Sequence, residues 1–231
     1  LRTSSALFAR LPGGGFARHT IEYPSGRDTG FSSLYYPGEA ILGLMRLYAL
    51  TEDKTYLDAA DEGARYIIEV RDADLPHHML PHDHWLLYGL AEIYAHRPRQ
   101  VYLDHTLLLG GVILADQNIN DDEPDLIGSF SSMAGSTSTA CRAEGLMAAR
   151  RLLRRAGRDE AARRCLEGVM LAARYQLLTQ IQPPTAMYLP RPDLAMGGFR
   201  DNFTSFVIRI DFVQHNISAL LALDRALAGE E

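Results

Sequence analysis

The chain has 231 residues, of which 47% are hydrophobic and 23% are charged, and its formal net charge is −6. This length and composition are typical of a soluble globular protein with a sizeable core, so we expect a single domain over residues 1–231. The acidic balance argues against a nucleic-acid partner, and no apolar run reaches the length that a membrane-spanning helix needs.

The two cysteines, Cys141 and Cys165, are too few for a disulfide framework. Free thiols and a cytoplasmic location are therefore expected. The chain begins at Leu1 rather than methionine. Export of a longer precursor, or an upstream domain, therefore stays open as an alternative.

The first predicted element is a helical hairpin. Apolar residues at helical spacing predict a helix over residues 40–48, and a second apolar stripe predicts another over residues 56–71. The polar segment 51–54 separates them and is expected to form the turn.

The same pattern returns 46 residues further along the chain, where Tyr94 takes the place of Tyr48. It predicts a second hairpin with helices over residues 85–93 and 101–113. A fixed period in this range is typical of one supersecondary unit stacked several times.

A third, longer copy includes residues 143–146, a glycine-containing turn at 155–159 and the segment 173–175. A fourth begins at residues 214–217 and stops after one helix. Three copies carry a glycine–leucine pair in the first helix, which predicts that these helices pack closely at Gly43, Gly89 and Gly145.

A glycine-rich segment precedes three of the hairpins, with Gly14, Gly128 and Gly197 in related positions. Alternating apolar residues after the last segment predict a strand over residues 203–212. We therefore expect an all-α fold. It would be an (α/α) toroid or partial toroid of repeated helical hairpins, with short β-strands at one end.

The functional candidates are polar residues near the starts of the inner helices. In ring-stacked hairpins the first helix of each pair lies inside, and its unpaired amides create positive potential at that end. Polar groups there would converge on one mouth. The catalytic candidates are His215, Asp211, Glu39 and His84. The candidates for substrate binding are Tyr36, Asp83, Trp85, Arg142, Glu144, Arg200, Asn202, Arg209 and Gln214.

Asp211 and His215 are four residues apart at a helix start and are expected to face the same way. A carboxylate beside an imidazole favours the imidazolium and selects its tautomer, which makes a general acid or base. The alternative is that the candidates only cap helices and pair locally, Arg142 with Glu144 and Arg209 with Asp211.

Four histidines lie close together in a proline-containing segment: His77, His78, His82 and His84. Their spacing matches no closed zinc pattern, so no metal is expected. The chain also lacks a dinucleotide or phosphate-binding glycine motif, and no cofactor is expected. A zinc-dependent alternative would need Cys141 close to His84 or His215.

The first hairpin resembles those of the six-hairpin (α/α) toroid superfamily through Tyr36-Pro37-Gly38-Glu39-Ala40, Leu47-Tyr48, Thr51, Asp53 and Tyr56-Leu57. That group includes N-acylglucosamine 2-epimerase-like proteins, unsaturated glucuronyl hydrolases and the C-terminal region of glucuronyl C5-epimerases. The resemblance covers residues 13–227 and is specific for no single family. It implies carbohydrate binding at the mouth of the inner helices.

Two hypotheses follow from the sequence. The first is a carbohydrate-active enzyme acting on a sugar or uronic-acid-containing saccharide, with Asp211 and His215 as acid and base and an arginine holding the substrate carboxylate. The alternative is a non-catalytic helical-repeat binding module or a domain of a larger biosynthetic protein. The expected partner is a small molecule or an oligosaccharide. Clustered candidates would favour the enzyme, and locally paired ones the module.

Overall fold

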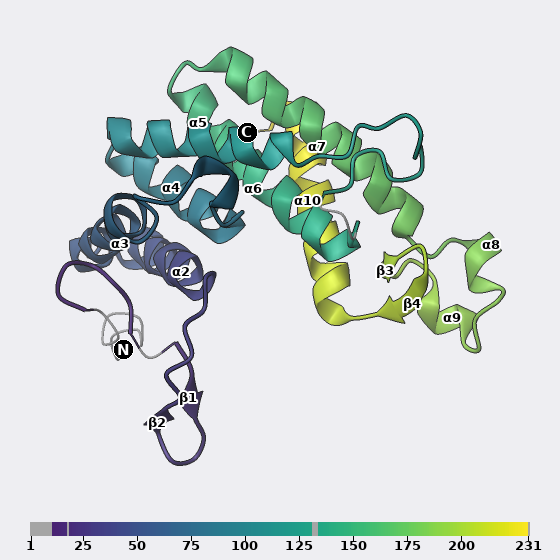
Figure 1. The fold of residues 1–231 in the computed structure, drawn as a ribbon, viewed down its shortest axis with the longest axis horizontal. Coiled ribbons are helices and arrows are strands. Elements are labelled where there is room, and N and C mark those ends of the chain that lie inside the picture. The colour runs from purple at the N-terminus through teal and green to yellow at the C-terminus, as the bar shows by residue number, and fades with distance from the viewer. Residues whose placement is uncertain (1–10, 18, 131–133, 231) are drawn as a thin grey trace. The chain divides into compact units, whose positions relative to one another are not determined.

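A computed structural model describes residues 11–17, 19–130 and 134–230. These residues form helices and two small antiparallel sheets of two strands each, which confirms a mostly helical fold (Figure 1). The chain divides into two compact parts, unit 1 (residues 1–109) and unit 2 (residues 110–231). Within the described residues, no helix combines the length and the apolar character that crossing a membrane requires.

Unit 1 contains both of the first two predicted hairpins. Its elements are β1 (Ile21–Glu22), β2 (Arg27–Asp28), α2 (Tyr36–Thr51), α3 (Lys54–Tyr66) with its π-helical continuation η1 (Ile67–Arg71), the 3-10 turn η2 (His77–Met79), α4 (His84–His96) and the first part of α5 (Gln100–Ala115). The predicted helix ending at residue 71 is therefore confirmed as α3 plus η1. The β1–β2 hairpin extends away from α2 (Figure 1).

Helices α2 and α4 lie side by side and run in the same direction. A Cβ added at Gly38 would lie 2.7 Å from the backbone nitrogen of Leu86, and one added at Gly89 would lie 2.6 Å from Cγ2 of Ile41. The predicted close packing is thus confirmed at Gly89. It is wrong at Gly43, which has open space where a Cβ would be. Both helices start at the same end of unit 1.

The buried carboxylate of Asp61 joins α3 to the start of α5. The Tyr102 hydroxyl donates to Asp61 Oδ1 over 2.6 Å. Arg99 and Arg97 place guanidinium nitrogens 3.1 and 3.4 Å from Asp61 Oδ2. A buried charge needs such partners, because an unpaired one is strongly destabilising. This network holds the second helices of the two hairpins together.

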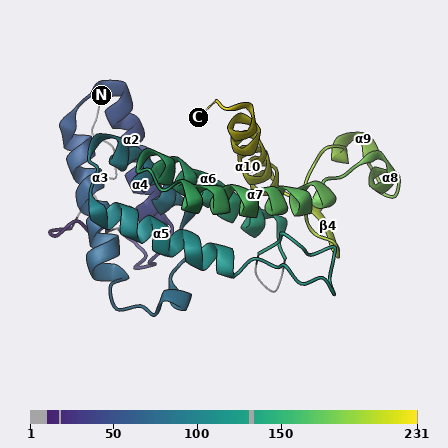
Figure 2. The ribbon, with the colours of Figure 1, turned by 90° about the horizontal axis from the view of Figure 1, so that it is seen from above.

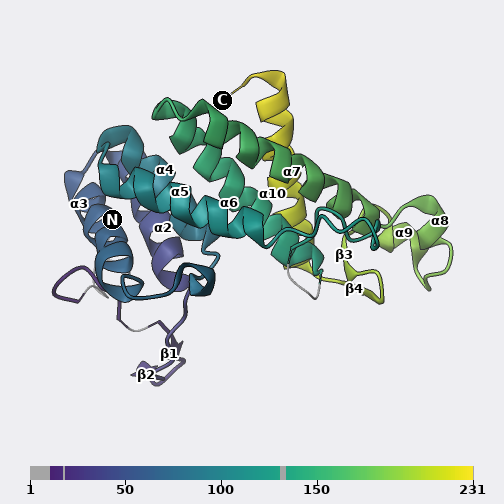
Figure 3. The ribbon, with the colours of Figure 1, turned by 45° about the horizontal axis from the view of Figure 1, so that its top comes forward.

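Unit 2 contains the third hairpin and the single helix of the fourth copy. Its elements are the rest of α5, α6 (Ser136–Arg155), α7 (Asp159–Thr179), α8 (Pro183–Ala186), α9 (Pro192–Ala195), β3 (Arg200–Asn202), β4 (Ser205–Ile208) and α10 (Ile210–Ala228). Gly157, at φ 67°, lies in the turn between α6 and α7. Figures 2 and 3 show α6 beside α7, with α10 packed against them.

The predicted strand over residues 203–212 is wrong in its second half. Strand β4 ends at Ile208 and α10 begins at Ile210, four residues before the expected start of the fourth copy. The buried residues of α10 recur at helical spacing: Phe212, Asn216, Ala219 and Leu223. The free energy gained by burying that helical face outweighs the strand preference of the short alternating segment. The acidic residue Asp211 in the first turn also favours the helix.

Two of the three predicted glycine-rich segments make equivalent contacts, whereas a Cβ added at Gly197 would meet no atom within 4 Å. Gly14 and Gly128 both have positive φ values, 97° and 93°. A Cβ at Gly14 would lie 2.5 Å from the carbonyl oxygen of Glu62, and one at Gly128 would lie 1.9 Å from that of Leu171. Both carbonyls stand four residues before the tyrosine of an Ala-Arg-Tyr motif. The two segments therefore contact equivalent positions of α3 and α7.

Candidate functional site

The start of α4 carries three of the predicted residues. Asp83 is the N-cap, and its Oδ1 accepts a hydrogen bond of 3.0 Å from the backbone nitrogen of Leu86. Burial raises the pKa of Asp83 to about 7. His84 is also buried, and its ring centroid lies 4.7 Å from that of the half-buried Trp85. This part of unit 1 is compact and aromatic.

The start of α2 is next to it within the same unit. Tyr36 is half-buried with its ring 4.8 Å from that of His19, and burial raises the pKa of the Tyr36 hydroxyl. The ring of Tyr35 lies 6.3 Å from that of His84. Glu39 is exposed in the first turn of α2. Unit 1 therefore groups aromatic and histidine side chains but leaves this carboxylate facing solvent.

Unit 1 also has a pocket that sequence reasoning missed. Its volume is about 380 Å³, and apolar side chains such as Leu108 line it together with Asp72 and His105. Burial lowers the pKa of His105 to about 4. The predicted residues of α2 and α4 lie outside this pocket.

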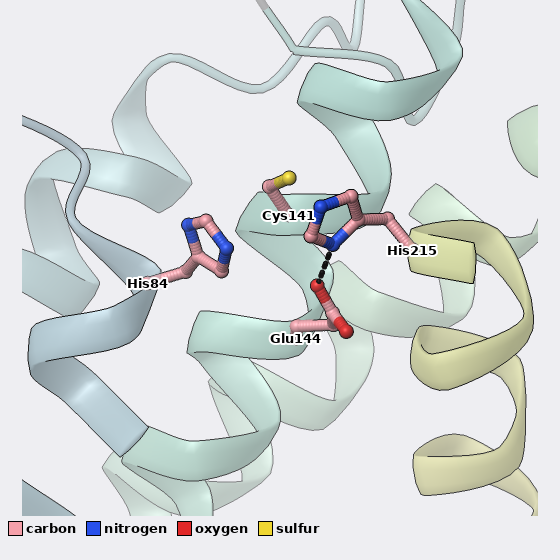
Figure 4. A group of neighbouring side chains, drawn as sticks. All are labelled: His84, Cys141, Glu144 and His215. Atoms are coloured by element: carbon pink, nitrogen blue, oxygen red, sulfur yellow. Dashed lines mark hydrogen bonds and ion pairs between the residues drawn. The ribbon is translucent and has the colours of Figure 1, made fainter. Parts of the chain in front are cut away.

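In unit 2, His215 of α10 is paired with Glu144 of α6. His215 Nδ1 lies 2.7 Å from Glu144 Oε2 (Figure 4). The Glu144 side chain is 4% exposed and that of His215 is 13% exposed. The sequence placed both residues among the candidates but did not pair them.

Cys141 completes this group. It precedes Glu144 by three residues, so both side chains project from one face of α6. The Cys141 side chain is hydrogen-bonded to the ring of His215. In Figure 4 its sulfur lies beside Nε2, the ring nitrogen on the far side from Glu144. The imidazole is therefore held between a thiol and a carboxylate.

The electrostatics of the group favour a charged imidazole. Hydrogen bonds to Cys141 and Glu144 raise the pKa of His215 to about 10. Burial raises the pKa of Glu144, while hydrogen bonds from His215 and Ser218 act in the opposite direction. The imidazole of His215 is accordingly protonated at neutral pH.

The predicted pairing of Asp211 with His215 is wrong. Asp211 instead accepts two hydrogen bonds from Arg209, of 3.0 and 2.8 Å. Arg209 is the N-cap of α10, and its guanidinium reaches the first-turn carboxylate directly. Glu144, from a different helix, takes the place that Asp211 was expected to have.

Arg142, the candidate arginine on α6, is bound by other groups of unit 2. Arg142 donates to the Ser138 carbonyl over 3.1 Å and lies 3.8 Å from Asp116 Oδ2. The expected partner, Glu144, binds His215 instead.

The candidate residues in β3 mainly stabilise the turn that joins β3 to β4. Arg200 lies 5.2 Å from the ring centroids of both Phe203 and Phe206. Asn202 accepts hydrogen bonds from the backbone of the turn that joins β3 to β4. Gln214 is exposed on α10.

Cys141, Glu144 and His215 also form a possible set of metal ligands. Each offers one ligand atom, and these atoms lie within 4.8 Å of one another. Thiolate, imidazole and carboxylate are the ligand types that zinc takes in proteins. Figure 4 also draws His84, which belongs to unit 1. His77 and His78 are exposed in η2 and lie outside this set.

Comparisons of the chain with protein-family models, with curated proteins and with solved structures found no match.

Proposed function

We propose that the chain is a carbohydrate-active enzyme that transfers protons through His215. The observation that carries the proposal is the buried hydrogen bond of 2.7 Å between His215 Nδ1 and Glu144 Oε2. A histidine whose ring a second group orients is the usual device for general acid/base catalysis.

The pair defines the atom that would exchange the proton. Glu144 occupies Nδ1, so the proton that reaches a substrate would leave from Nε2, where the substrate would replace Cys141 as the hydrogen-bond partner. Because the pKa of His215 is raised to about 10, the imidazolium is the resting form and would act first as an acid. A positioned acid of this kind typically contributes about 10²–10⁴-fold in rate.

The substrate class in this proposal is a sugar or a uronic-acid-containing saccharide. Support comes from the repeated hairpins, which resemble those of the six-hairpin superfamily, and the proposal includes an (α/α) toroid or partial toroid. Phe206, half exposed beside the guanidinium of Arg200, offers an aromatic face for a sugar and a cation for a carboxylate.

The alternative is a helical-repeat module that binds a ligand without catalysis. Two observations favour it: Arg209 is bound to Asp211, and Arg142 is bound within its own unit. Side chains that are satisfied locally are less available to a substrate. The two proposals differ in whether a bound saccharide is turned over.

The test is a ligand screen followed by an assay for turnover. Melting of the full chain is followed with glucuronate, galacturonate, glucosamine and short acidic oligosaccharides, because a ligand that binds the native state raises the melting temperature. Any sugar that shifts it is then assayed for bond cleavage and for uptake of solvent deuterium at carbon. The enzyme proposal expects turnover that His215→Gln and Glu144→Gln reduce by at least about 100-fold.

Asp224→Asn is the matched control, since it also removes a carboxylate but from an exposed position on α10. It should leave turnover unchanged. A melting shift without turnover would support the module instead. If no saccharide shifts the melting temperature, the carbohydrate class is wrong for both proposals.

A further inference from the structure

The pocket of about 380 Å³ lies wholly within unit 1 and is built by three segments of the chain. One is a face of α5, on which Val101, His105 and Leu108 are four and three residues apart. The others are η1, through Ile68, and the segment 72–80 that follows it. The volume falls within the range of about 300–1,000 Å³ that is usual for small-molecule sites.

Hydrogen bonds fix the segment that follows η1. The amide of Asp72 donates to the Ile67 carbonyl over 3.0 Å, and the amide of Leu75 donates to the Asp72 carbonyl over 3.1 Å. Arg71 binds both carboxylate oxygens of Asp72 at 2.7 Å and also donates to the Leu34 carbonyl. In addition, η1 is a π-helical turn, a form that often occurs at functional sites. The pocket is therefore largely preformed, as most small-molecule sites are.

His105 is a buried polar side chain in the wall of this pocket. It is 7% exposed, and it makes no hydrogen bond with any described residue. Its ring nitrogens are not among the fully covered, unpartnered polar atoms of the described residues, so they are accessible from the pocket that His105 lines. Buried polar groups are nearly always hydrogen-bonded. His105 therefore offers an unused donor and acceptor to a molecule in the pocket.

The charges around the pocket favour a neutral ligand. Two carboxylates line it and both have partners, since Asp72 is bound by Arg71. Asp104 accepts a hydrogen bond of 2.7 Å from Gln100. No lysine or arginine is among the described residues that line the pocket. An anion would thus meet no free cation, and a cation would lose hydration without gaining an unpaired carboxylate. Burial also lowers the pKa of His105 to about 4, so its imidazole is neutral at pH 7.

We propose that this pocket binds a small neutral alcohol, whose hydroxyl is hydrogen-bonded to His105 and whose apolar body lies against the aliphatic side chains. A neutral imidazole has one donor and one acceptor nitrogen, and a hydroxyl both donates and accepts. A hydroxyl can therefore pair with either nitrogen of His105, whereas a carbonyl can pair only with the donor. The apolar contacts would come from Ile68, Leu75, Leu80, Val101 and Leu108. The inference goes beyond the proposed function, because it involves neither His215 nor Glu144.

The first experiment uses four probes that share one benzene ring: benzyl alcohol, toluene, benzoate and benzylammonium. Each is titrated into the full chain at pH 7, and binding is followed through the amide chemical shifts of α5 by NMR. We expect benzyl alcohol to cause saturable shifts over residues 101–108. Both charged probes should bind at least about ten times more weakly, because each would lose hydration without a free counter-charge. Either charged probe binding as tightly as benzyl alcohol, or no saturable shift with benzyl alcohol, would overturn the proposal.

The second experiment compares two probes in two proteins to measure the contribution of His105. Toluene lacks the hydroxyl, so the dissociation constant of benzyl alcohol divided by that of toluene reports the hydrogen bond apart from the apolar contacts. His105→Phe should raise this ratio at least about five-fold, since the bound hydroxyl loses its partner. His105→Gln keeps a donor and an acceptor and should raise it less. An equal ratio in wild type and a folded His105→Phe, or a His105→Gln ratio as high as that of His105→Phe, would refute the role of His105.

Two tryptophan variants locate the site. Leu108→Trp places an indole in the pocket and should abolish the binding of benzyl alcohol. Leu107→Trp adds the same side chain at an exposed position of α5 outside the pocket, and this matched control should bind as wild type does. Circular dichroism checks that both variants are folded. Equal dissociation constants in the two variants would refute the pocket as the site. This outcome is distinct from failure of the proposed function, because no step measures saccharide turnover.

Discussion

Nδ1 of His215 lies 2.7 Å from Oε2 of Glu144, although the two residues are 71 positions apart in the chain. The bond joins α10 to α6 inside unit 2. It orients the imidazole, directs Nε2 towards the sulfur of Cys141 and gives the ring an anionic neighbour (Figure 4). The orientation of the imidazole and part of the rise in its pKa therefore depend on one contact between two helices.

Replacing Glu144 with glutamine should lower the pKa of His215 from about 10. The hydrogen bond with Cys141 is the larger cause of the raised pKa and remains, but the neutral amide removes the negative charge of Glu144, so the pKa falls part of the way towards the ordinary value of about 6.5. NMR titration of the His215 ring protons measures it. Asp211→Asn is the control, and because Asp211 is bound to Arg209 it should shift the pKa by less than about 0.5. A larger effect of Asp211→Asn than of Glu144→Gln would contradict the assignment.

Unit 1 should lose stability in mild acid through His105. Burial lowers the pKa of His105 to about 4, below the value of about 6.5 in the unfolded chain. As the pH falls, the His105 side chain of the unfolded chain therefore takes up a proton before that of the folded protein does. The contribution of the neutral side chain is complete above pH 6.5 and is lost as the pH falls towards 4, by at most roughly 3 kcal/mol. Urea unfolding at pH 7 and pH 4.5 measures it, and His105→Gln should show a smaller difference. An equal difference would show that other groups dominate.

The Tyr102 hydroxyl should contribute measurably to stability. Tyr102→Phe removes the donor of the 2.6 Å bond to Asp61 and leaves a buried carboxylate with fewer partners. We expect the free energy of unfolding to fall by about 1–3 kcal/mol. Tyr188→Phe, at an 81% exposed position, should change it by less than about 0.5 kcal/mol. Chemical denaturation compares them, and equal effects would mean that the Asp61 network is not a stabilising link.

Gly128→Ala should destabilise unit 2 more than Gly157→Ala. Both glycines have positive φ, 93° and 67°, so each alanine costs about 1–2 kcal/mol for the backbone conformation alone. At Gly128 the new Cβ would also lie 1.9 Å from the Leu171 carbonyl oxygen, whereas Gly157 has open space. The difference between the losses of unfolding free energy in the two variants therefore measures the cost of the close contact at Gly128. Equal losses would show that the Gly128 segment moves away from α7 without cost.

The helical hairpins could be predicted from the sequence because the information is local. An apolar stripe at helical spacing needs no knowledge of distant residues, and the 46-residue recurrence shows that the unit is repeated. The prediction was wrong where two local patterns overlapped. Residues 203–212 alternate like a strand, but the burial of Phe212 and Asn216 on one face of α10 decided for helix.

The sequence predicted which residues form the candidate site but not which of them are hydrogen-bonded to one another. Glu144 and His215 stood among the predicted residues because they lie on predicted helices near their polar ends. Their pairing was missed, since the nearest carboxylate in sequence, Asp211, was taken as the partner. Spacing along one helix shows which residues share a face, as Cys141 and Glu144 do. It cannot show which face of another helix they meet.

By itself, the sequence determined the repeated helical hairpins, the glycine segments that precede them and the residue types available for chemistry. These follow from backbone preferences and apolar periodicity within a few turns of chain. Only the tertiary structure decided that Asp211 is neutralised by Arg209 and that His215 is held between Glu144 and Cys141. The physical reason is that burial and hydrogen bonding depend on which helices pack together, and in unit 2 the packing of α10 against α6 joins residues 71 positions apart.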